Sequence, residues 1–277
     1  MKIFVKTFCV AALWMALAAT GYSQGVGGDH FTIPLNDPAR PASVNVNAFA
    51  GSISVKGYDG NEIIVDTKYM EGQKPPKQSE ADTTGLKRIT STSPMIDVEN
   101  NTVNIRTGPM SFASDITLQV PKHTMLVLKK IGEGDITVEQ VRGEIEVNNI
   151  NGNVNLSEVS GSVVAHALNG SVKVTLLDVE PDTPSSFSSM NGNVDVSLPA
   201  DLKANLSIKT MQGDIFSGFD VKTDPNEIQN KIDESRKEGG DFEISVGGTL
   251  RGTINGGGSE MQFKTFNGNI YIRKLSR

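Results

Sequence analysis

The chain has 277 residues, with 26 lysines and arginines against 32 aspartates and glutamates, a formal net charge of −6 and a mean hydropathy of −0.22. This acidic balance argues against a protein that binds the phosphates of nucleic acids. The single cysteine, Cys9, lies in a segment that we expect to be removed, which excludes disulfides, cysteine metal sites and thiol catalysis from the remainder.

Residues 1–23 have the features of a secretory signal peptide. Lys2 and Lys6 precede an apolar run over residues 8–19, and small residues lead up to Gln24. The run is too short to span a membrane comfortably, and no later stretch is as long and apolar as a span requires. We therefore expect the mature chain, 24–277, to be exported to the periplasm, the cell surface or the medium, and to form one elongated domain.

Short strands separated by turn residues are predicted in the first part of the chain. Alternating apolar residues indicate strands within 29–69 and again within 96–120, and Gly51 begins the first clear unit of glycine followed by alternation. Between these stretches, residues 70–94 contain two adjacent prolines and many charges. This composition predicts a surface excursion with a short helix at 81–88.

A nine-residue repeat occupies residues 134–177. It reads GDITVEQVR, GEIEVNNIN, GNVNLSEVS, GSVVAHALN and GSVKVTLLD, with apolar residues at the second, fourth and seventh positions after each glycine. The first two alternate with polar residues, as in a strand with one buried face, and the third is expected to start the corner. The glycine supplies the left-handed backbone that a tight corner requires.

Units this short leave no room for a crossover helix between parallel strands. The strands either reverse as hairpins in a meander or continue in one direction as a flattened coil with two units per turn. The recurrence of one residue type at one corner favours the coil, in which equivalent residues stack about 4.8 Å apart. Asn151, Asn169 and Asn191 would then form a side-chain ladder along one edge.

The repeat continues with longer corners to the end of the chain. Gly192, Gly213 and Gly268 each begin a similar unit, and the polar segment 222–240 forms a second surface excursion, either helical or irregular. We therefore predict an all-β fold. It is an elongated single-stranded β-solenoid of the β-helix or β-roll type, with strand-turn units of about nine residues, about 18–22 residues per coil, and capped ends.

The sequence predicts no catalytic, cofactor or metal residues. Calcium-binding β-rolls carry carboxylates at every corner. In this repeat a single corner, the one at Asp135, resembles such a corner. Glu144 and Glu146 supply outward carboxylates of the kind that polysaccharide-cleaving enzymes use, although any acidic coil is expected to have solvated carboxylates. The histidines have no metal-ligand spacing: His30, His123 and His166.

Phe216 and Tyr271 are the candidate residues of a surface binding patch. Each stands at the third position after its glycine, where an outward side chain is expected. Exposed aromatic residues can mark a site for a glycan or a protein. The alternative is that each ring packs beneath a corner or a terminal cap.

Four longer stretches have a recognisable order and phrasing: VNAFAGSISVKGYDG, GDITVEQVRGEIEVNNINGNVNLSEVSGSVVAHALNGSVKV, MNGNVDVSLPADLKANLSIKTMQGDI and INGGGSEMQFKTFNGNIYIRK. In these stretches the chain resembles the bacterial putative adhesin family of unknown function, which is defined by a DUF4097-type domain. The resemblance covers nearly all of the predicted mature chain. It implies a secreted or envelope protein with a β-solenoid-like fold, and it brings no catalytic residues.

From these features we expect an exported, non-enzymatic scaffold or binding protein of the cell envelope, adhesin-like in role and without a cofactor. Its partner would be an envelope or extracellular glycan or protein, and not a nucleic acid. The alternative from another class is a polysaccharide-active β-helix enzyme, either a lyase or a glycoside hydrolase.

Overall fold

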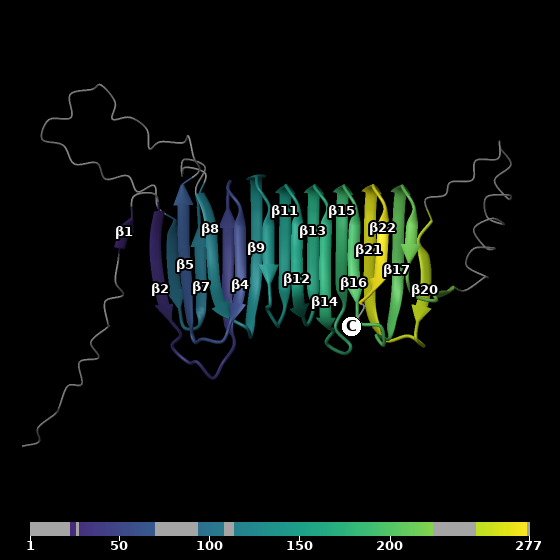
Figure 1. The fold of residues 1–277 in the computed structure, drawn as a ribbon, viewed down its shortest axis with the longest axis horizontal. Coiled ribbons are helices and arrows are strands. Elements are labelled where there is room, and N and C mark those ends of the chain that lie inside the picture. Colours follow the sequence, from purple (N-terminus) through teal and green to yellow (C-terminus); the bar gives the residue numbers. More distant parts are fainter. Residues whose placement is uncertain (1–22, 26–27, 70–93, 108–113, 224–247, 276–277) are drawn as a thin grey trace, which may run out of the picture.

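The computed structural model describes residues 23–25, 28–69, 94–107, 114–223 and 248–275. Over these ranges the chain forms two 11-stranded sheets that lie face to face along one long axis (Figure 1). No helix in the described ranges is long and apolar enough to cross a membrane. Apart from their edges, the predicted signal peptide 1–23 and the predicted excursions 70–94 and 222–240 lie outside the described residues, as does the helix expected at 81–88.

The two sheets are named A and B, and the strands of each follow one another in space in this order. Sheet A comprises β1 (Ser23–Gly25), β2 (Gly28–Pro34), β5 (Glu62–Tyr69), β8 (Ser114–Pro121), β4 (Ile53–Tyr58), β10 (Ile136–Glu139), β12 (Val154–Ser160), β14 (Val172–Asp178), β16 (Val194–Leu198), β22 (Ile270–Lys274) and β18 (Ile215–Ser217). Sheet B comprises β19 (Lys222–Thr223), β20 (Leu250–Ile254), β17 (Ala204–Gln212), β21 (Ser259–Asn267), β15 (Ser185–Asn191), β13 (Val163–Asn169), β11 (Ile145–Asn151), β9 (Thr124–Glu133), β3 (Ala42–Ala48), β7 (Thr102–Arg106) and β6 (Met95–Glu99).

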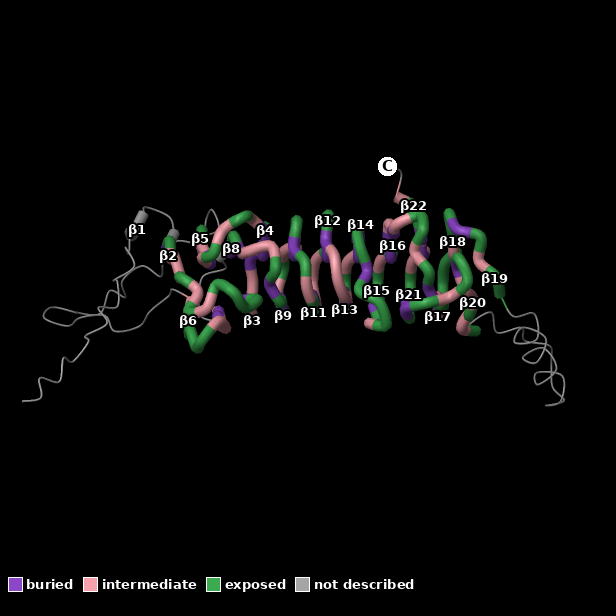
Figure 2. The backbone as a smooth tube through the Cα atoms, turned by 90° about the horizontal axis from the view of Figure 1, so that it is seen from below, coloured by how far each residue is buried: buried purple, intermediate pink, exposed green. Residues whose placement is uncertain are grey.

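The nine-residue repeat forms a coil and not a hairpin meander. Successive units alternate between the sheets, so that β10, β12 and β14 are parallel neighbours in sheet A while β11 and β13 are parallel neighbours in sheet B. Val154 therefore pairs with Ile136 on one side and Val172 on the other, each 18 residues away. The two rows of strands are seen from below in Figure 2. The predicted β-solenoid is confirmed.

Alternation places the second and fourth residues of each unit in the core, as predicted, but the third apolar position behaves differently from one unit to another. The seventh residue is buried at Val141 and Val159 in sheet A. In β12 this requires an irregularity, with Glu158 at φ 54°. Elsewhere alternation continues without interruption, so the sixth residue faces inward and the seventh faces outward: Ile150, Leu168 and Leu177.

The corner glycines are required because the coils stack closely. Gly152 has a φ of 136°, and a Cβ atom on it would lie 1.9 Å from the carbonyl oxygen of Gly134 in the coil below. Beside this corner runs the predicted side-chain ladder, which we call the asparagine ladder. Its side-chain amides donate to the next side-chain oxygen at 3.0, 2.9 and 2.8 Å, in the order Asn169 to Asn151, Asn191 to Asn169, and Asn267 to Asn191.

Inward polar side chains bind the corner carbonyls from inside. Asn149, Ser189 and Thr265 donate to the carbonyl oxygens of glycines 134, 170 and 192 at 3.0, 2.8 and 2.9 Å. Lys130 occupies the same row and is only 1% exposed. Its Nζ donates to carbonyl oxygens of residues 132 and 151 and, at 3.5 Å, to Asn149 Oδ1. Burial lowers the pKa of Lys130 to about 8, although Asp135 and Glu133 act to raise it.

The coils do not stack in chain order. The last strand pair, β21 and β22, lies between the coil of β15 and β16 and the coil of β17 and β18. In Figure 1 the yellow strands β21 and β22 accordingly lie between the green strands β16 and β17. The repeat does reach the end of the chain, as predicted, but its last coil is internal. Similarly, β3 and β4 lie next to β9 and β10, with β7 and β8 outside them.

Antiparallel strands cover the parallel region at its N-terminal end in both sheets and at its other end in sheet B. At the N-terminal end β2, β5 and β8 are antiparallel neighbours in sheet A, and β6 and β7 are antiparallel in sheet B. At the other end β17, β20 and β19 are antiparallel neighbours in sheet B. These reversals end the stacking of coils, which otherwise presents unpaired strand edges that other chains can join. The expected caps are therefore present at the N-terminal end and in sheet B at the other end, where sheet A ends on the parallel strand β18.

Candidate ligand-binding surface

The two aromatic residues selected from the sequence lie side by side on the outer face of sheet A. Phe216 in β18 and Tyr271 in β22 are opposite each other in the register of the two strands. Their rings are stacked, with centroids 5.1 Å apart and an interplanar angle of 8°. Phe216 is 49% exposed. The rings therefore pack against each other at the surface, and not beneath a corner.

Polar side chains hold the tyrosine end of this ring pair in place. Asn269 Nδ2 donates to the Tyr271 hydroxyl at 3.0 Å. Arg273 lies with its guanidinium carbon 5.1 Å from the Tyr271 ring centroid, within range of a cation–π attraction. The guanidinium also forms a bidentate pair with Asp195, at 2.7 Å from Nε and 3.1 Å from Nη2, and this hydrogen bonding raises the pKa of Arg273.

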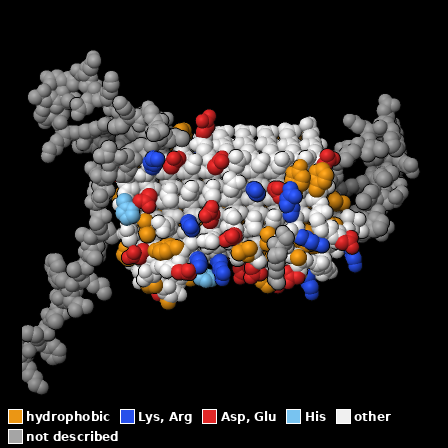
Figure 3. All heavy atoms as spheres, in the orientation of Figure 1, with side chains coloured by type: hydrophobic (Ala, Val, Ile, Leu, Met, Phe, Trp, Pro, Cys, Tyr) orange, Lys and Arg blue, Asp and Glu red, His pale blue; other side chains and the backbone are white. Residues whose placement is uncertain are grey.

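We call five residues on this face the aromatic–arginine patch: Asp195, Phe216, Asn269, Tyr271 and Arg273. Figure 3 shows the face of sheet A, where orange hydrophobic side chains lie beside blue and red ones toward the right-hand end. The patch combines flat apolar rings with fixed donors and acceptors. Such a set suits a ligand that has both apolar C–H faces and hydroxyl or amide groups.

The sequence identified two of these five residues and missed the others. Asp195 could have been found, because it stands at the third position after Gly192, as Phe216 and Tyr271 do after their glycines. In the structure the three side chains follow one another across neighbouring strands of sheet A. Residues that share a position in the repeat form one column, so Asp195 belonged with the aromatic pair.

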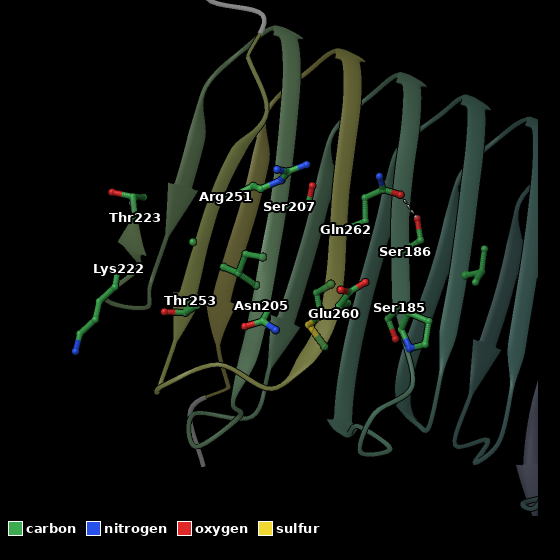
Figure 4. A pocket seen from close by; sticks show the side chains of 15 residues that line it. Ser185, Ser186, Asn205, Ser207, Lys222, Thr223, Arg251, Thr253, Glu260 and Gln262 are labelled. Carbon is green, nitrogen blue, oxygen red and sulfur yellow. Dashed lines mark hydrogen bonds between the residues drawn. The ribbon is translucent and has the colours of Figure 1, made fainter. Parts of the chain in front are cut away.

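A groove of about 960 Å³ lies on the opposite sheet, near the same end of the solenoid. Its floor is the outer face of β15, β21, β17 and β20 (Figure 4), and Pro184 is among its lining residues. Seven of its fifteen lining residues carry a side-chain hydroxyl or amide group, and Ser186 Oγ donates to Gln262 Oε1 at 3.3 Å. Lys222, Arg251 and Glu260 supply its charges.

The carboxylates that the enzyme alternative would use do not converge. Asp135 lies at the corner before sheet A, where its Oδ1 accepts a hydrogen bond from the Asn153 backbone N–H at 2.7 Å. Glu144 and Glu146 belong to the other side of the coil, and Glu146 pairs with Lys129 at 3.1 Å. In the described ranges, no three His, Cys, Asp or Glu side chains are grouped so that they could hold a metal ion.

The three histidines lie in separate parts of the solenoid. His30 Nδ1 pairs with Asp66 Oδ1 at 2.6 Å, and His123 forms an isolated bridge with Arg142. His166 is partly buried on the outer face of sheet B, where its Nδ1 lies 2.8 Å from Ser188 Oγ. Burial, followed by the charge of Lys264, lowers the pKa of His166.

The chain is wound into two sheets of mainly parallel strands, with glycine at the corners and antiparallel strands at the caps. This architecture places it in the class of single-stranded β-solenoids. Within this class, the family model described as Toastrack DUF4097 matches residues 31–255, and the chain belongs to that family. The family expected from the sequence is therefore confirmed.

Two solved structures illustrate what the chain is similar to. One is a putative cell adhesion protein from Clostridium sporogenes ATCC 15579, with 12% identity over 90% of this chain and 99% of that chain, at a TM-score of 0.47. The other is a putative adhesin from Bacteroides fragilis NCTC 9343, with 8% identity over 91% of this chain and 98% of that chain, at a TM-score of 0.30. No curated protein matches.

Proposed function

We propose that the protein is an exported, non-enzymatic binding protein of the cell envelope, adhesin-like in role, and that its ligand is an extracellular or envelope glycan. The observation that carries the proposal is the exposed, stacked ring pair of Phe216 and Tyr271. Among the described residues, sheet A has no strand beyond β18. No described strand therefore covers the face of Phe216 that points away from Tyr271. The ring forms a platform at the end of a rigid surface.

Glycan chemistry fits the two halves of the aromatic–arginine patch. The C–H face of a pyranose ring is apolar and packs on an aromatic ring, as other amphipathic ligands do. Its hydroxyl groups need donors and acceptors that are already fixed, which lowers the entropic cost of binding. Arg273 and Asp195 are fixed by their mutual bidentate pair, and Asn269 is fixed by the tyrosine hydroxyl. A flexible surface loop would not provide this preorganisation.

The test is a binding screen of the chain 24–277 on an array of bacterial and host glycans, with and without calcium. We expect one glycan class to bind, and Phe216→Ala to weaken that binding by roughly tenfold or more. Leu177→Ala is the matched control, because Leu177 is also 49% exposed but lies outside the patch. Equal binding by the two variants would remove the patch from the proposal.

The same screen separates binding from cleavage. Products from each bound glycan are analysed for shortened chains, and we expect the glycan to be recovered unchanged. Shortened products would overturn the non-enzymatic part of the proposal and support the lyase or glycoside hydrolase alternative. Export is tested separately by sequencing the N-terminus of the protein recovered from outside the cytoplasm, which we expect to begin at Gln24.

A further inference from the structure

An exposed apolar row, which we call the apolar stripe, runs along the outer face of sheet B. It has one residue from each of six neighbouring strands, in the spatial order Ile131, Ile150, Leu168, Met190, Phe266 and Met211. Four of the six side chains are 43 to 52% exposed, and the other two are partly exposed. Five steps of about 4.8 Å make the stripe about 24 Å long.

The stripe is a property of the repeat and not an isolated surface residue. Its side chains occupy the position just before the asparagine ladder, so each coil contributes one apolar group at the same place. Single exposed apolar residues are normal in folded proteins, but a contiguous row of large ones marks an interaction surface. Strand formation does not require these apolar side chains, because a strand can carry a polar residue at an outward position without losing its backbone hydrogen bonds.

The two sides of the stripe differ in charge. On the corner side lies the neutral asparagine ladder, which Glu133 extends at one end and Gln212 at the other. On the other side lies a row that contains three lysines, of which Lys129 pairs with Glu146 of the adjoining row: Lys129, Asn148, His166, Ser188, Lys264 and Lys209. A partner must therefore cover an apolar line, avoid positive charge on one side and offer hydrogen-bonding groups to the lysines.

We propose that the apolar stripe is the interface through which two copies of this chain form a dimer. The best geometric match to a straight row with one side chain per coil is a second row of the same spacing. With the two-fold axis along the stripe, the lysine row of one copy faces the asparagine ladder of the other. The amide oxygens of that ladder accept hydrogen bonds from the lysines, and like charges stay apart.

The alternative pairing, with the two solenoids antiparallel, is unfavourable. A two-fold axis across the stripe would place the two lysine rows opposite each other, and like charges across an interface cost binding free energy. The proposed dimer therefore has its solenoid axes parallel, with each stripe residue opposite its own counterpart. The glycan-binding patches on the two A sheets then face outward on opposite sides.

The area of the stripe is sufficient for a small specific interface. A large apolar side chain offers about 150–250 Å² in total, so about half of it amounts to roughly 100 Å². The four residues that are about half exposed give roughly 400 Å² and the two less exposed ones roughly 100 Å² between them, so two copies together bury about 1,000 Å², the lower limit for a specific interface. The flanking rows add to this area, so we expect a weak dimer with a micromolar dissociation constant.

The test is sedimentation equilibrium of the chain 24–277 at protein concentrations up to about 100 μM. We expect a monomer–dimer equilibrium, and Leu168→Glu should weaken the dimer by roughly a hundredfold because it buries an unpaired charge. Val164→Glu is the matched control, since Val164 is on the same strand and the same face, is 44% exposed and lies outside the stripe. Thermal unfolding of both variants shows that they remain folded.

Orientation is tested by cross-linking, because the predicted mature chain contains no cysteine. Met211→Cys should form a disulfide with its counterpart in the parallel dimer, whereas in an antiparallel dimer residue 211 would face the opposite end of the stripe. A monomeric wild type, or a dimer that Leu168→Glu leaves intact, would overturn the proposal. Stripe-dependent binding to phosphatidylglycerol vesicles by a monomeric chain would also overturn it, in favour of a membrane surface.

Failure of the dimer and failure of the proposed function are distinguishable. The stripe lies on sheet B and the aromatic–arginine patch lies on sheet A. Leu168→Glu should therefore bind a glycan in solution with unchanged affinity per chain. On a dense glycan surface it should dissociate faster than the wild type, because two linked sites raise the effective concentration of the second.

Discussion

Deletion of residues 259–277 removes an internal coil, and we expect the loss of stability to be far larger than for a terminal repeat. In a solenoid that stacks in chain order, removing the last coil deletes one interface with its only neighbour. Here β21 has parallel partners on both sides, β15 and β17, and β22 has β16 and β18. The chain 24–258 would keep the end module of β17, β18 and β20 but lose the coil that joins it to the rest.

The magnitude follows from the side chains that the deleted coil buries. Met261, Phe263, Ile270 and Ile272 are each at most 1% exposed. Burial of such a side chain contributes about 1.5–3 kcal/mol, so the four contribute about 6–12 kcal/mol before ordering entropy is subtracted. This range is comparable to the whole stability of an ordinary domain, about 5–15 kcal/mol. We therefore expect the chain 24–258 to lose its C-terminal structure completely.

The assay is urea unfolding followed by circular dichroism, with the m-value as a measure of the surface that folding buries. A peptide of residues 259–277 added in trans should restore part of the lost signal, because the gap in both sheets remains its template. The same interface can be tested by point variants in dilute protein. Phe263→Ala should cost about 3–5 kcal/mol, whereas the outward Phe266→Ala should cost less than about 1 kcal/mol. If the truncated chain has the same urea unfolding midpoint and m-value as the wild type, residues 259–277 are not an inserted coil and the reasoning is refuted.

Two further predictions concern the corners. Gly152→Ala should lower the free energy of unfolding by about 2–5 kcal/mol in a urea titration, since it combines backbone strain with a steric clash against the coil below; Gly256→Ala, at φ 95° with open space around its Cβ, should show the strain alone. The second prediction concerns Lys130, whose pKa is about 8 in the folded protein and 10.5 in the unfolded chain. Between these two pH values the unfolded chain binds more protons than the folded protein, so a rise in pH favours the folded state. The free energy of unfolding of the wild type should therefore rise by about 2–3 kcal/mol from pH 8 to 10.5. Lys130→Met should abolish that rise and the exposed Lys129→Met should retain it; parallel pH curves for the two variants would show that Lys130 is not the titrating group.

The features predicted well from the sequence are those that depend on local pattern. Glycine at a fixed interval followed by alternation specifies both a corner and a strand with one buried face, so the coil and its asparagine ladder could be derived from Asn151, Asn169 and Asn191. The outward positions of Phe216 and Tyr271 followed from the same counting. Their contact could not be predicted, because it depends on the last coil lying next to β18.

The features predicted poorly are those that depend on which coils are neighbours. Ile270 and Ile272 fit the core of any coil, so the sequence does not distinguish a terminal coil from an inserted one. The seventh position of the repeat was apolar for two different physical reasons. Val159 is apolar because it enters the core after an irregularity, whereas Leu168 is apolar on the outer face, and a hydropathy pattern assigns both to one class.

The position of the last coil also determines the order in which this protein can be completed during synthesis. Ribosomes release the chain from the N-terminus, and repeat proteins usually add each unit to one that is already present. Residues 204–217 leave the ribosome before the coil on which they pack, so until residues 259–275 follow, β17 has no partner in sheet B other than β20. The inserted coil is therefore completed after the coil that lies outside it has been synthesised.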